Sequence, residues 1–138
     1  MAKLKKSVDK KHGNEKICRS FVHWVDSIME EDIPHIAEAV NFNIYEGSEN
    51  TYDIELIAAS EYDESDEDWV CDEVFTTRDN LFYIPRTSEI AEWKKGRDFV
   101  CALIKHYLDI GKNKDKLKSY RAVCAGFVDG NIEIVYKL

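Results

Sequence analysis

Carboxylates are the chemically active side chains that this sequence concentrates most. Between Arg19 and Arg78 the chain carries 17 Asp and Glu residues and no Lys or Arg. Twelve of the 17 lie between Glu46 and Glu73, and the densest run is Glu61-Tyr62-Asp63-Glu64-Ser65-Asp66-Glu67-Asp68-Trp69. Such a run could bind a metal cation, supply a pair of groups for acid–base catalysis, or attract a basic protein.

Metal binding is the first of these possibilities. Asp63, Ser65 and Asp68 offer oxygen ligands, but an EF-hand loop requires glycine at position six and glutamate at position twelve. Counted from Asp63, those positions hold Asp68 and Val74. We therefore expect no specific calcium site.

Zinc is not expected either. His23 and His106 each lie five residues from a cysteine, Cys18 and Cys101 respectively. Side chains share a helical face at separations of three or four residues, not five. The sequence therefore predicts no metal ligands among these residues.

Acid–base catalysis is the second possibility. Asp53 with Glu55, and Asp72 with Glu73, are candidate carboxylate pairs if their strands converge. A catalytic carboxylate usually needs a buried setting that shifts its pKa, and nucleophile elbows, Walker loops and HExxH motifs are absent from the sequence. We predict no catalytic residue and no cofactor. A small enzyme or ligand-binding domain with a pocket between helices and sheet remains an alternative.

The distribution of charge favours the third possibility, a basic protein partner. The net charge of −8 comprises +5 over residues 1–19, −17 over 20–77 and +4 over 78–138. An acidic chain of this kind repels nucleic acids and anionic membranes, so neither is expected as a partner. A basic protein would be attracted, and electrostatic complementarity would make association fast and specific.

The residues predicted to contact this partner surround the densest acidic run. We expect its carboxylates to steer the partner, and the flanking Tyr62 and Trp69 to anchor it. The predicted set is Glu61, Tyr62, Asp63, Glu64, Asp66, Glu67, Asp68, Trp69, Asp72 and Glu73. The alternative is a solvated loop, which most charge runs are, in an adaptor or structural domain whose acidic face keeps it soluble.

The elements that position these residues follow from hydrophobic periodicity. Apolar residues recur at helical spacing from Ile17 to Ile28, which predicts a helix over 15–31. Alternation then predicts strands near 40–45 and 52–58, which form an antiparallel hairpin. A third strand is expected over 69–75 and a short fourth over 82–84.

The second half of the chain predicts another helix and a final hairpin. The helix is expected to begin near Ser88 and to end before Gly111, with close packing at Gly96. A basic connector over 112–118 follows. Two final strands, 122–128 and 132–136, flank Asp129-Gly130, which is a strong hairpin signal.

Runs of strands between helices predict an α+β fold. We expect one mainly antiparallel sheet of five or six strands, with two main helices packed on one face. Residues 1–14, which are rich in lysine, are predicted to be a basic flexible arm, and 15–138 a single α+β domain.

The compartment is inferred from segments that the sequence lacks. No apolar run approaches the ~20 residues of a membrane span, and the basic start is not followed by the apolar region of a secretory signal. We expect a cytoplasmic protein. Its four cysteines, Cys18, Cys71, Cys101 and Cys124, are then expected to be reduced and buried.

Three stretches together resemble a known class of proteins. They are Tyr52-Asp53-Ile54-Glu55-Leu56, the run from Asp68 to Phe75, and the run from Ala125 to Glu133. In size, order of elements and acidic surface the chain resembles immunity proteins, which bacteria encode beside secreted polymorphic toxins. The resemblance implies that the protein binds and blocks one cognate toxin domain, often a basic nuclease.

Overall fold

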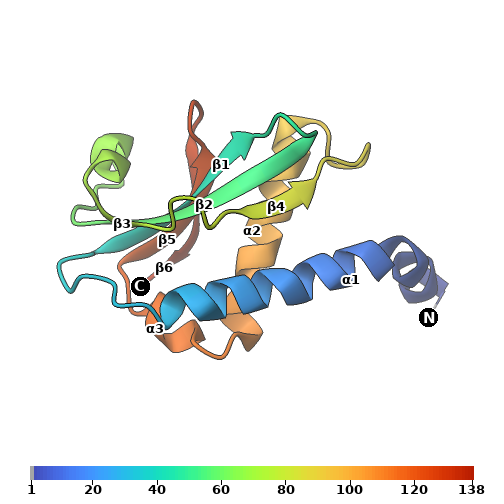
Figure 1. The fold of residues 1–138 in the computed structure, drawn as a ribbon, viewed down its shortest axis with the longest axis horizontal. Helices are drawn as coiled ribbons and strands as arrows, with labels where there is room; N and C mark the ends of the chain where they lie inside the picture. The colour runs from blue at the N-terminus through green and yellow to red at the C-terminus, as the bar shows by residue number, and fades with distance from the viewer. Residues whose placement is uncertain (1) are drawn as a thin grey trace.

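A six-stranded sheet covered by helices on one face forms the body of the molecule (Figure 1). The computed structural model describes the backbone of residues 2–138 and the side chains of residues 13–138. Its helices are α1 (Ala2–Met29), the 3-10 helix η1 (Glu67–Cys71), α2 (Trp93–Ile110) and α3 (Lys114–Lys118). Its strands are β1 (Ala39–Glu46), β2 (Thr51–Ala59), β3 (Glu73–Thr76), β4 (Phe82–Pro85), β5 (Ala122–Phe127) and β6 (Ile132–Lys137).

The strand order is β3-β2-β1-β5-β6, with β4 also paired to β2. The β1–β2 and β5–β6 hairpins are antiparallel, as the sequence predicts. The hairpins meet through β1 and β5, which run parallel, with Ala39 opposite Ala122 and Ile44 opposite Phe127. The prediction of a mainly antiparallel sheet is confirmed, and the parallel pairing makes the sheet a mixed one.

One face of the sheet carries the main hydrophobic core. Alternate residues of the central strands, such as Phe42 and Leu56, point to this face and are fully buried. Phe21 of α1 lies 5.8 Å from Phe42 and 5.3 Å from Phe82 between ring centroids. Residues of α2, including Ile104, join the same cluster. The prediction that two main helices pack on one face is confirmed.

Element boundaries differ from the prediction in three places. The α1 helix begins at Ala2, so its backbone includes most of the range predicted as an arm, 1–14; Met1 lies outside the described residues. The α2 helix begins at Trp93 instead of near Ser88, because a turn with a hydrogen bond from the Ile90 N–H to the Thr87 carbonyl precedes it.

The predicted third strand over 69–75 is wrong in its first half. Residues 67–71 form η1, and strand β3 begins only at Glu73. The side chain of Asp66 accepts a hydrogen bond from the Asp68 N–H and so caps η1. Cys71, predicted to be buried in that strand, is consequently exposed, whereas Cys124 is buried as predicted.

Among the described residues, no helix combines the length and the apolar character needed to cross a membrane.

Candidate functional site

The acidic segment, defined here as residues 61–73, lies on the face of the sheet opposite α1. Figure 1 shows α1 below the sheet and η1 above it. Trp69 of η1 is 5 % exposed and packs in a small second core with the outward residues of the central strands. These are Ala39, Ile57, Ala59, Ala122 and Cys124. The segment is therefore attached to the sheet and does not form a free loop.

The two aromatic residues predicted as anchors have structural roles. The rings of Tyr62 and Trp69 pack edge to face, with centroids 5.4 Å apart. The guanidinium of Arg121 lies over the ring of Tyr62, 5.3 Å from its centroid. Trp69 is almost fully buried and packs the segment against the sheet, and its role as an anchor for a partner stays a prediction. Tyr62 is half-buried and keeps some exposed surface.

Polar contacts fix the backbone of the acidic segment in detail. Asp63 accepts a hydrogen bond from the Ser65 N–H at 2.9 Å, a local turn. Glu67 accepts one from the Ile132 N–H of β6 at 3.1 Å. Glu64 pairs with Lys137, also of β6, at 2.7 Å. These two contacts join the segment to the terminal hairpin.

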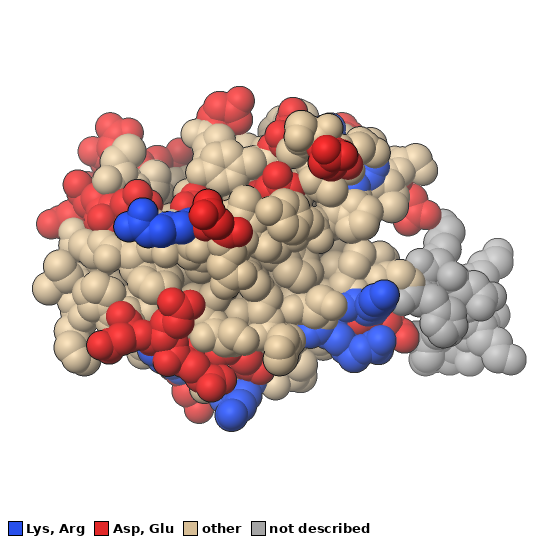
Figure 2. Space-filling model, in the orientation of Figure 1, with Lys and Arg blue, Asp and Glu red and all other residues tan. Residues whose placement is uncertain are grey.

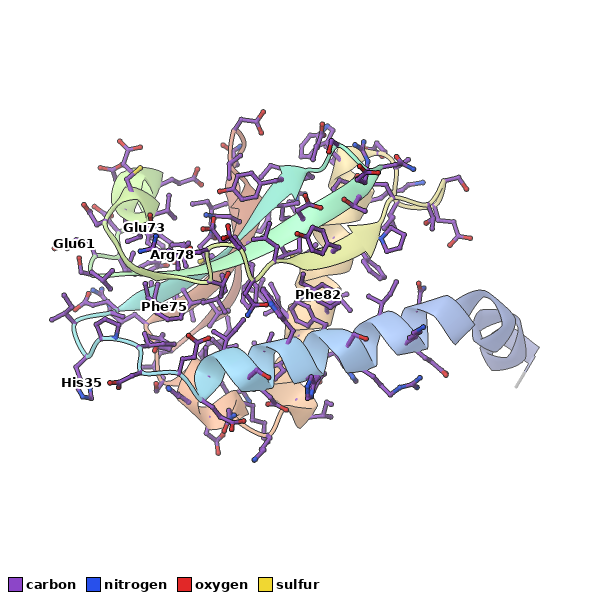
Figure 3. The ribbon with its side chains drawn as sticks, in the orientation of Figure 1. His35, Glu61, Glu73, Phe75, Arg78 and Phe82 are labelled. Carbon is purple, nitrogen blue, oxygen red and sulfur yellow. The ribbon has the colours of Figure 1, made fainter. Side chains whose placement is uncertain are left out.

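The charge of the segment faces solvent. All eight of its carboxylates are exposed: Glu61, Asp63, Glu64, Asp66, Glu67, Asp68, Asp72 and Glu73. Within the described part of the chain, Glu64 is the only one of them that has an ion pair. Acidic side chains gather at the end of the molecule where η1 lies (Figure 2), and Glu61 and Glu73 are both at that end (Figure 3).

The rest of this sheet face is uncovered and carries exposed tyrosines. Tyr45 of β1 pairs with Asp53 of β2, and Asp53 pairs with Tyr83 of β4. The tyrosines are 38 % and 57 % exposed. Because paired residues of neighbouring strands point to the same face, these residues form one row with a carboxylate between two tyrosines. We call this row, together with the adjacent Glu55, the open face.

Glu55 organises the open face through its hydrogen bonds. It accepts hydrogen bonds from Asn43 at 3.1 Å, from the Tyr45 hydroxyl at 2.8 Å and from the Thr76 hydroxyl. Partial burial, followed by the hydrogen bond to Glu55, raises the pKa of Tyr45 to about 12. Tyr45 therefore stays protonated, and able to donate to Glu55, at a higher pH than an ordinary tyrosine with a pKa of 10.0, and the network holds its ring in place.

The candidate carboxylate pairs do not converge. Glu73 pairs with Ala59, which lies four residues along β2 from Glu55. At about 3.3 Å per residue, the pair Asp53 and Glu55 is on the order of 13 Å or more from Glu73 along the strand. The backbone positions of these two candidate pairs are therefore well separated along the strands. Among the described residues, no group of three or more His, Cys, Asp or Glu is arranged to hold a metal ion.

No known protein family, curated protein or solved structure matches this chain.

The tyrosines of the open face were not among the contacts predicted from the sequence. Tyr45 and Tyr83 occupy outward positions of β1 and β4, opposite in direction to the buried Ile44 and Ile84. Strand alternation alone could have placed both of them on the solvent side. Their position on either side of Asp53 required the order of the strands in the sheet.

Proposed function

We propose that the protein binds a basic partner protein through the acidic segment and the open face. The observation that carries the proposal is the exposure of eight carboxylates on a segment that is fixed to the sheet, with one ion pair among them in the described chain. Like charges at this density repel one another. A cationic surface placed against them would relieve that repulsion.

The rigidity of the segment favours binding. Trp69 and the contacts to β6 hold the carboxylates in one arrangement before a partner arrives. Less conformational entropy is then lost on association than with a disordered acidic loop. Long-range attraction would raise the association rate from the 10⁵–10⁶ M⁻¹s⁻¹ typical of neutral surfaces to roughly 10⁸ M⁻¹s⁻¹ at low salt.

The open face supplies the anchors in this proposal. Tyrosine is enriched among the interface residues that contribute most to binding, because it offers apolar area and a polar group together. Tyr45 and Tyr83 are exposed, and Asp53 between them can pair with a cationic side chain. In this proposal Tyr45 and Tyr83 take the anchoring role that was predicted for Trp69.

The partner we propose is a toxin domain, which the protein neutralises by covering a basic surface. Support for this step comes from the resemblance to immunity proteins together with the charge of the acidic segment. A nuclease presents basic residues where it holds phosphates. An acidic inhibitor on that surface would exclude the nucleic acid.

The experiment starts by capturing the partner from lysate of the native host and then measures association with the purified partner. The test variant reverses Glu61, Asp68, Asp72 and Glu73 to Lys, which leaves Glu64, Asp66 and Glu67 to hold the segment. The matched control reverses Glu31, Asp32, Asp109 and Asp115, which are exposed residues of the helical side. We expect association at about 50 mM salt to slow by at least roughly tenfold in the test variant and much less in the control.

Two results would contradict the proposal. Equal slowing in both variants would show that only net charge matters, and binding that does not depend on salt would favour an adaptor with a merely solubilising acidic face. The inhibitor step has a separate readout. One equivalent of the protein should abolish the activity of the partner, and a partner that is bound yet fully active would leave a binding module without inhibition.

A further inference from the structure

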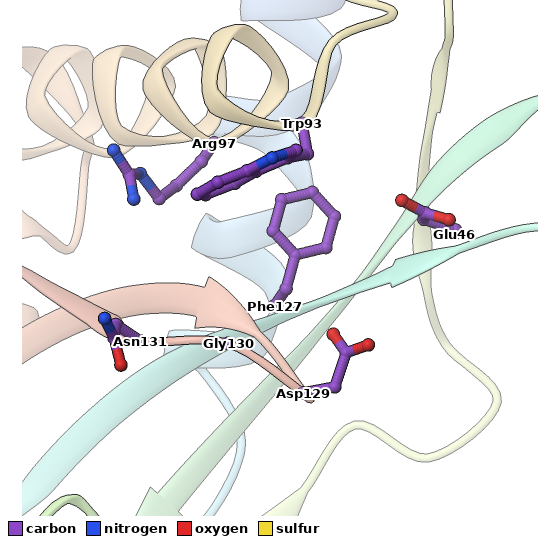
Figure 4. A pocket seen from close by; sticks show the side chains of 7 residues that line it. All are labelled: Glu46, Trp93, Arg97, Phe127, Asp129, Gly130 and Asn131. Atoms are coloured by element: carbon purple, nitrogen blue, oxygen red, sulfur yellow. The ribbon is translucent and has the colours of Figure 1, made fainter.

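A separate cavity lies on the helical side of the sheet, between the first turn of α2 and the β5–β6 turn (Figure 4). Its volume is about 370 Å³. It is lined by Glu46, Trp93, Arg97, Phe127, Asp129, Gly130 and Asn131. None of these residues belongs to the acidic segment or the open face, so an inference about the cavity does not depend on the proposed function.

Two aromatic rings form the apolar wall of the cavity. Trp93 and Phe127 pack edge to face, with centroids 6.3 Å apart. Trp93 is 47 % exposed, whereas Trp24 and Trp69 are 9 % and 5 % exposed. A half-exposed tryptophan that borders a cavity provides a π-face to which cations are attracted. The ammonium of Lys94 already lies over this ring, 5.6 Å from its centroid, so a ligand would use the part of the ring that remains exposed.

The positive charge at the cavity is already compensated. Arg97 pairs with Glu133 at 3.3 Å and with Asp98 at 3.6 Å. Its guanidinium also lies over the ring of Trp93, 5.3 Å from the centroid. A ligand carboxylate would have to compete with two protein carboxylates for the terminal nitrogens of Arg97. The Nε of Arg97 is buried and has no hydrogen-bond partner among the described residues.

The negative charge at the cavity is not compensated to the same degree. Among the described residues, Glu46 has an ion pair with Arg86, at 3.9 Å. Asp129 has no ion pair with any residue that the structure describes. Figure 4 shows Glu46 and Asp129 on one side of Phe127 and Arg97 on the other. One end of the cavity is therefore acidic and is bordered by aromatic rings.

We propose that this cavity binds an organic cation, a guanidinium or primary ammonium group on a short apolar stem. The stem would lie against Trp93 and Phe127, and the charged head between Glu46 and Asp129. A volume of about 370 Å³ is at the small end of the range for ligand sites and suits a group the size of one arginine or lysine side chain. Such a cation could be a free amine or a side chain of another protein.

The test uses two pairs of probes, each a cation with its uncharged isostere. Butylguanidinium and butylurea represent a free ligand, and N-acetyl-argininamide and N-acetyl-citrullinamide a side chain on a peptide backbone. Binding is followed by the indole N–H resonance of Trp93 in ¹⁵N-labelled protein, assigned by its loss in Trp93→Phe. The chain contains three tryptophans, so each resonance can be resolved.

We expect at least one cation to shift the Trp93 resonance saturably and its neutral isostere to bind about tenfold more weakly or not at all. In Glu46→Gln/Asp129→Asn the cation should also bind about tenfold more weakly. Neither Asp129 nor Gly130 has a positive φ, and asparagine is as acceptable as aspartate in a turn, so the double variant keeps the β5–β6 turn. The control, Glu31→Gln/Asp109→Asn, removes the same charge outside the cavity and should bind like the wild type.

The outcomes separate the two sources of the cation. Binding of butylguanidinium shows that the charged group is sufficient, and binding of N-acetyl-argininamide alone indicates a side chain of a protein. The proposal is overturned if neither cation shifts Trp93, if the neutral isosteres bind equally well, or if the double variant behaves like the control.

Discussion

The ring of Tyr62 packs edge to face on that of Trp69, and this contact joins the two ends of the most acidic stretch in the chain. The carboxylates between them are exposed, while Trp69 itself is buried against the sheet. Hydrophobic burial thus offsets the repulsion among neighbouring charges. A run that sequence alone describes as a charged loop is consequently a fixed part of the fold.

Replacing Trp69 with alanine tests this arrangement. Trp69→Ala removes a buried ring, and we expect the free energy of unfolding to fall by about 3–5 kcal/mol. Trp69→Phe keeps an aromatic ring and should cost less. The measurement is equilibrium unfolding in urea, combined with hydrogen exchange of the amides in the acidic segment, which should speed up more than those of β1 and β5.

The control for this prediction is Trp93→Ala. Trp93 is half-exposed, so its loss should change the free energy of unfolding by about 1 kcal/mol or less. Two outcomes would contradict the role given to Trp69. One is that Trp69→Ala and Trp93→Ala lower the free energy of unfolding by similar amounts. The other is that hydrogen exchange of the amides in the acidic segment is unchanged in Trp69→Phe and Trp69→Ala.

The hydrogen bond between Tyr45 and Glu55 leads to a prediction about pH. Tyr45 has a pKa of about 12 in the folded protein against an ordinary value of 10.0, so the folded state holds the phenol proton more tightly than the unfolded state. The stability that this contributes is fully present below pH 10 and is lost as the pH rises through about 12. Ring ¹³Cζ resonances of labelled tyrosine should show Tyr45 titrating late.

Glu55→Gln should lower the pKa of Tyr45 without restoring the ordinary value. Burial, the largest cause of the shift, remains in this variant, while the negative charge of the acceptor is lost. Tyr107 is an internal control, because its pKa is raised by burial and by its hydrogen bond to Asp26, far from Glu55. Titration of Tyr45 near pH 10 in the unmodified protein would refute the network as described.

The fold could largely be predicted because its signals are local. Alternation of apolar residues defined β1, β2 and β4, and the Asp129-Gly130 turn defined the final hairpin. The parallel pairing of β1 and β5 had no such local signal, because these two strands are far apart in the sequence, with β2 and α2 among the elements between them. The 3-10 helix was also missed, since Trp69-Val70-Cys71 has the composition of a strand.

The candidate site was predicted in part for the same reason. The exposed carboxylates could be read directly from the density of Asp and Glu, because charged residues are rarely buried unpaired. Whether the ring of Trp69 points to solvent or to the sheet could not be predicted, since an aromatic residue beside a charged run is compatible with exposure or burial. The row formed by Tyr45, Asp53 and Tyr83 depends on three strands, and the sequence did not show which strand edges meet.

A carboxylate on α1 stabilises the packing of the helices, and its loss should be measurable. Asp26 accepts hydrogen bonds from the Tyr107 hydroxyl at 2.6 Å and from the Asn113 N–H at 3.2 Å. Tyr107 is fully buried, so Asp26→Ala leaves its hydroxyl without this acceptor. We expect a loss of about 1–3 kcal/mol in the free energy of unfolding, and a smaller loss for Asp26→Asn, which keeps an acceptor.

A double-mutant cycle separates this hydrogen bond from other effects at Asp26. In a Tyr107→Phe background the hydroxyl is already absent, so Asp26→Ala should cost clearly less there than in the wild type. Equal costs in both backgrounds would show that Asp26 acts through Asn113 or through the helix itself.

Replacing Gly96 of α2 with alanine should destabilise the protein, although this substitution in a helix usually stabilises. Gly→Ala inside a helix normally stabilises by up to about 1 kcal/mol. At Gly96, however, an added Cβ would lie 2.5 Å from ring atoms of Tyr52. That ring cannot easily move, because Tyr52 is fully buried and its hydroxyl donates to the carbonyl of Ile90 at 2.7 Å. We therefore expect Gly96→Ala to lower the free energy of unfolding by about 1–3 kcal/mol.

Gly13→Ala is the matched control for the Gly96 prediction. Gly13 is also in a helix, α1, and an added Cβ there would meet nothing within 4 Å. This substitution should leave stability unchanged or raise it, as measured by urea unfolding of both variants. Tyr52→Leu should reduce the cost of Gly96→Ala, since the smaller side chain vacates the space. A Gly96→Ala protein as stable as the wild type would mean that α2 can shift away from β2, and the tight contact between Tyr52 and Gly96 would then not be required by the fold.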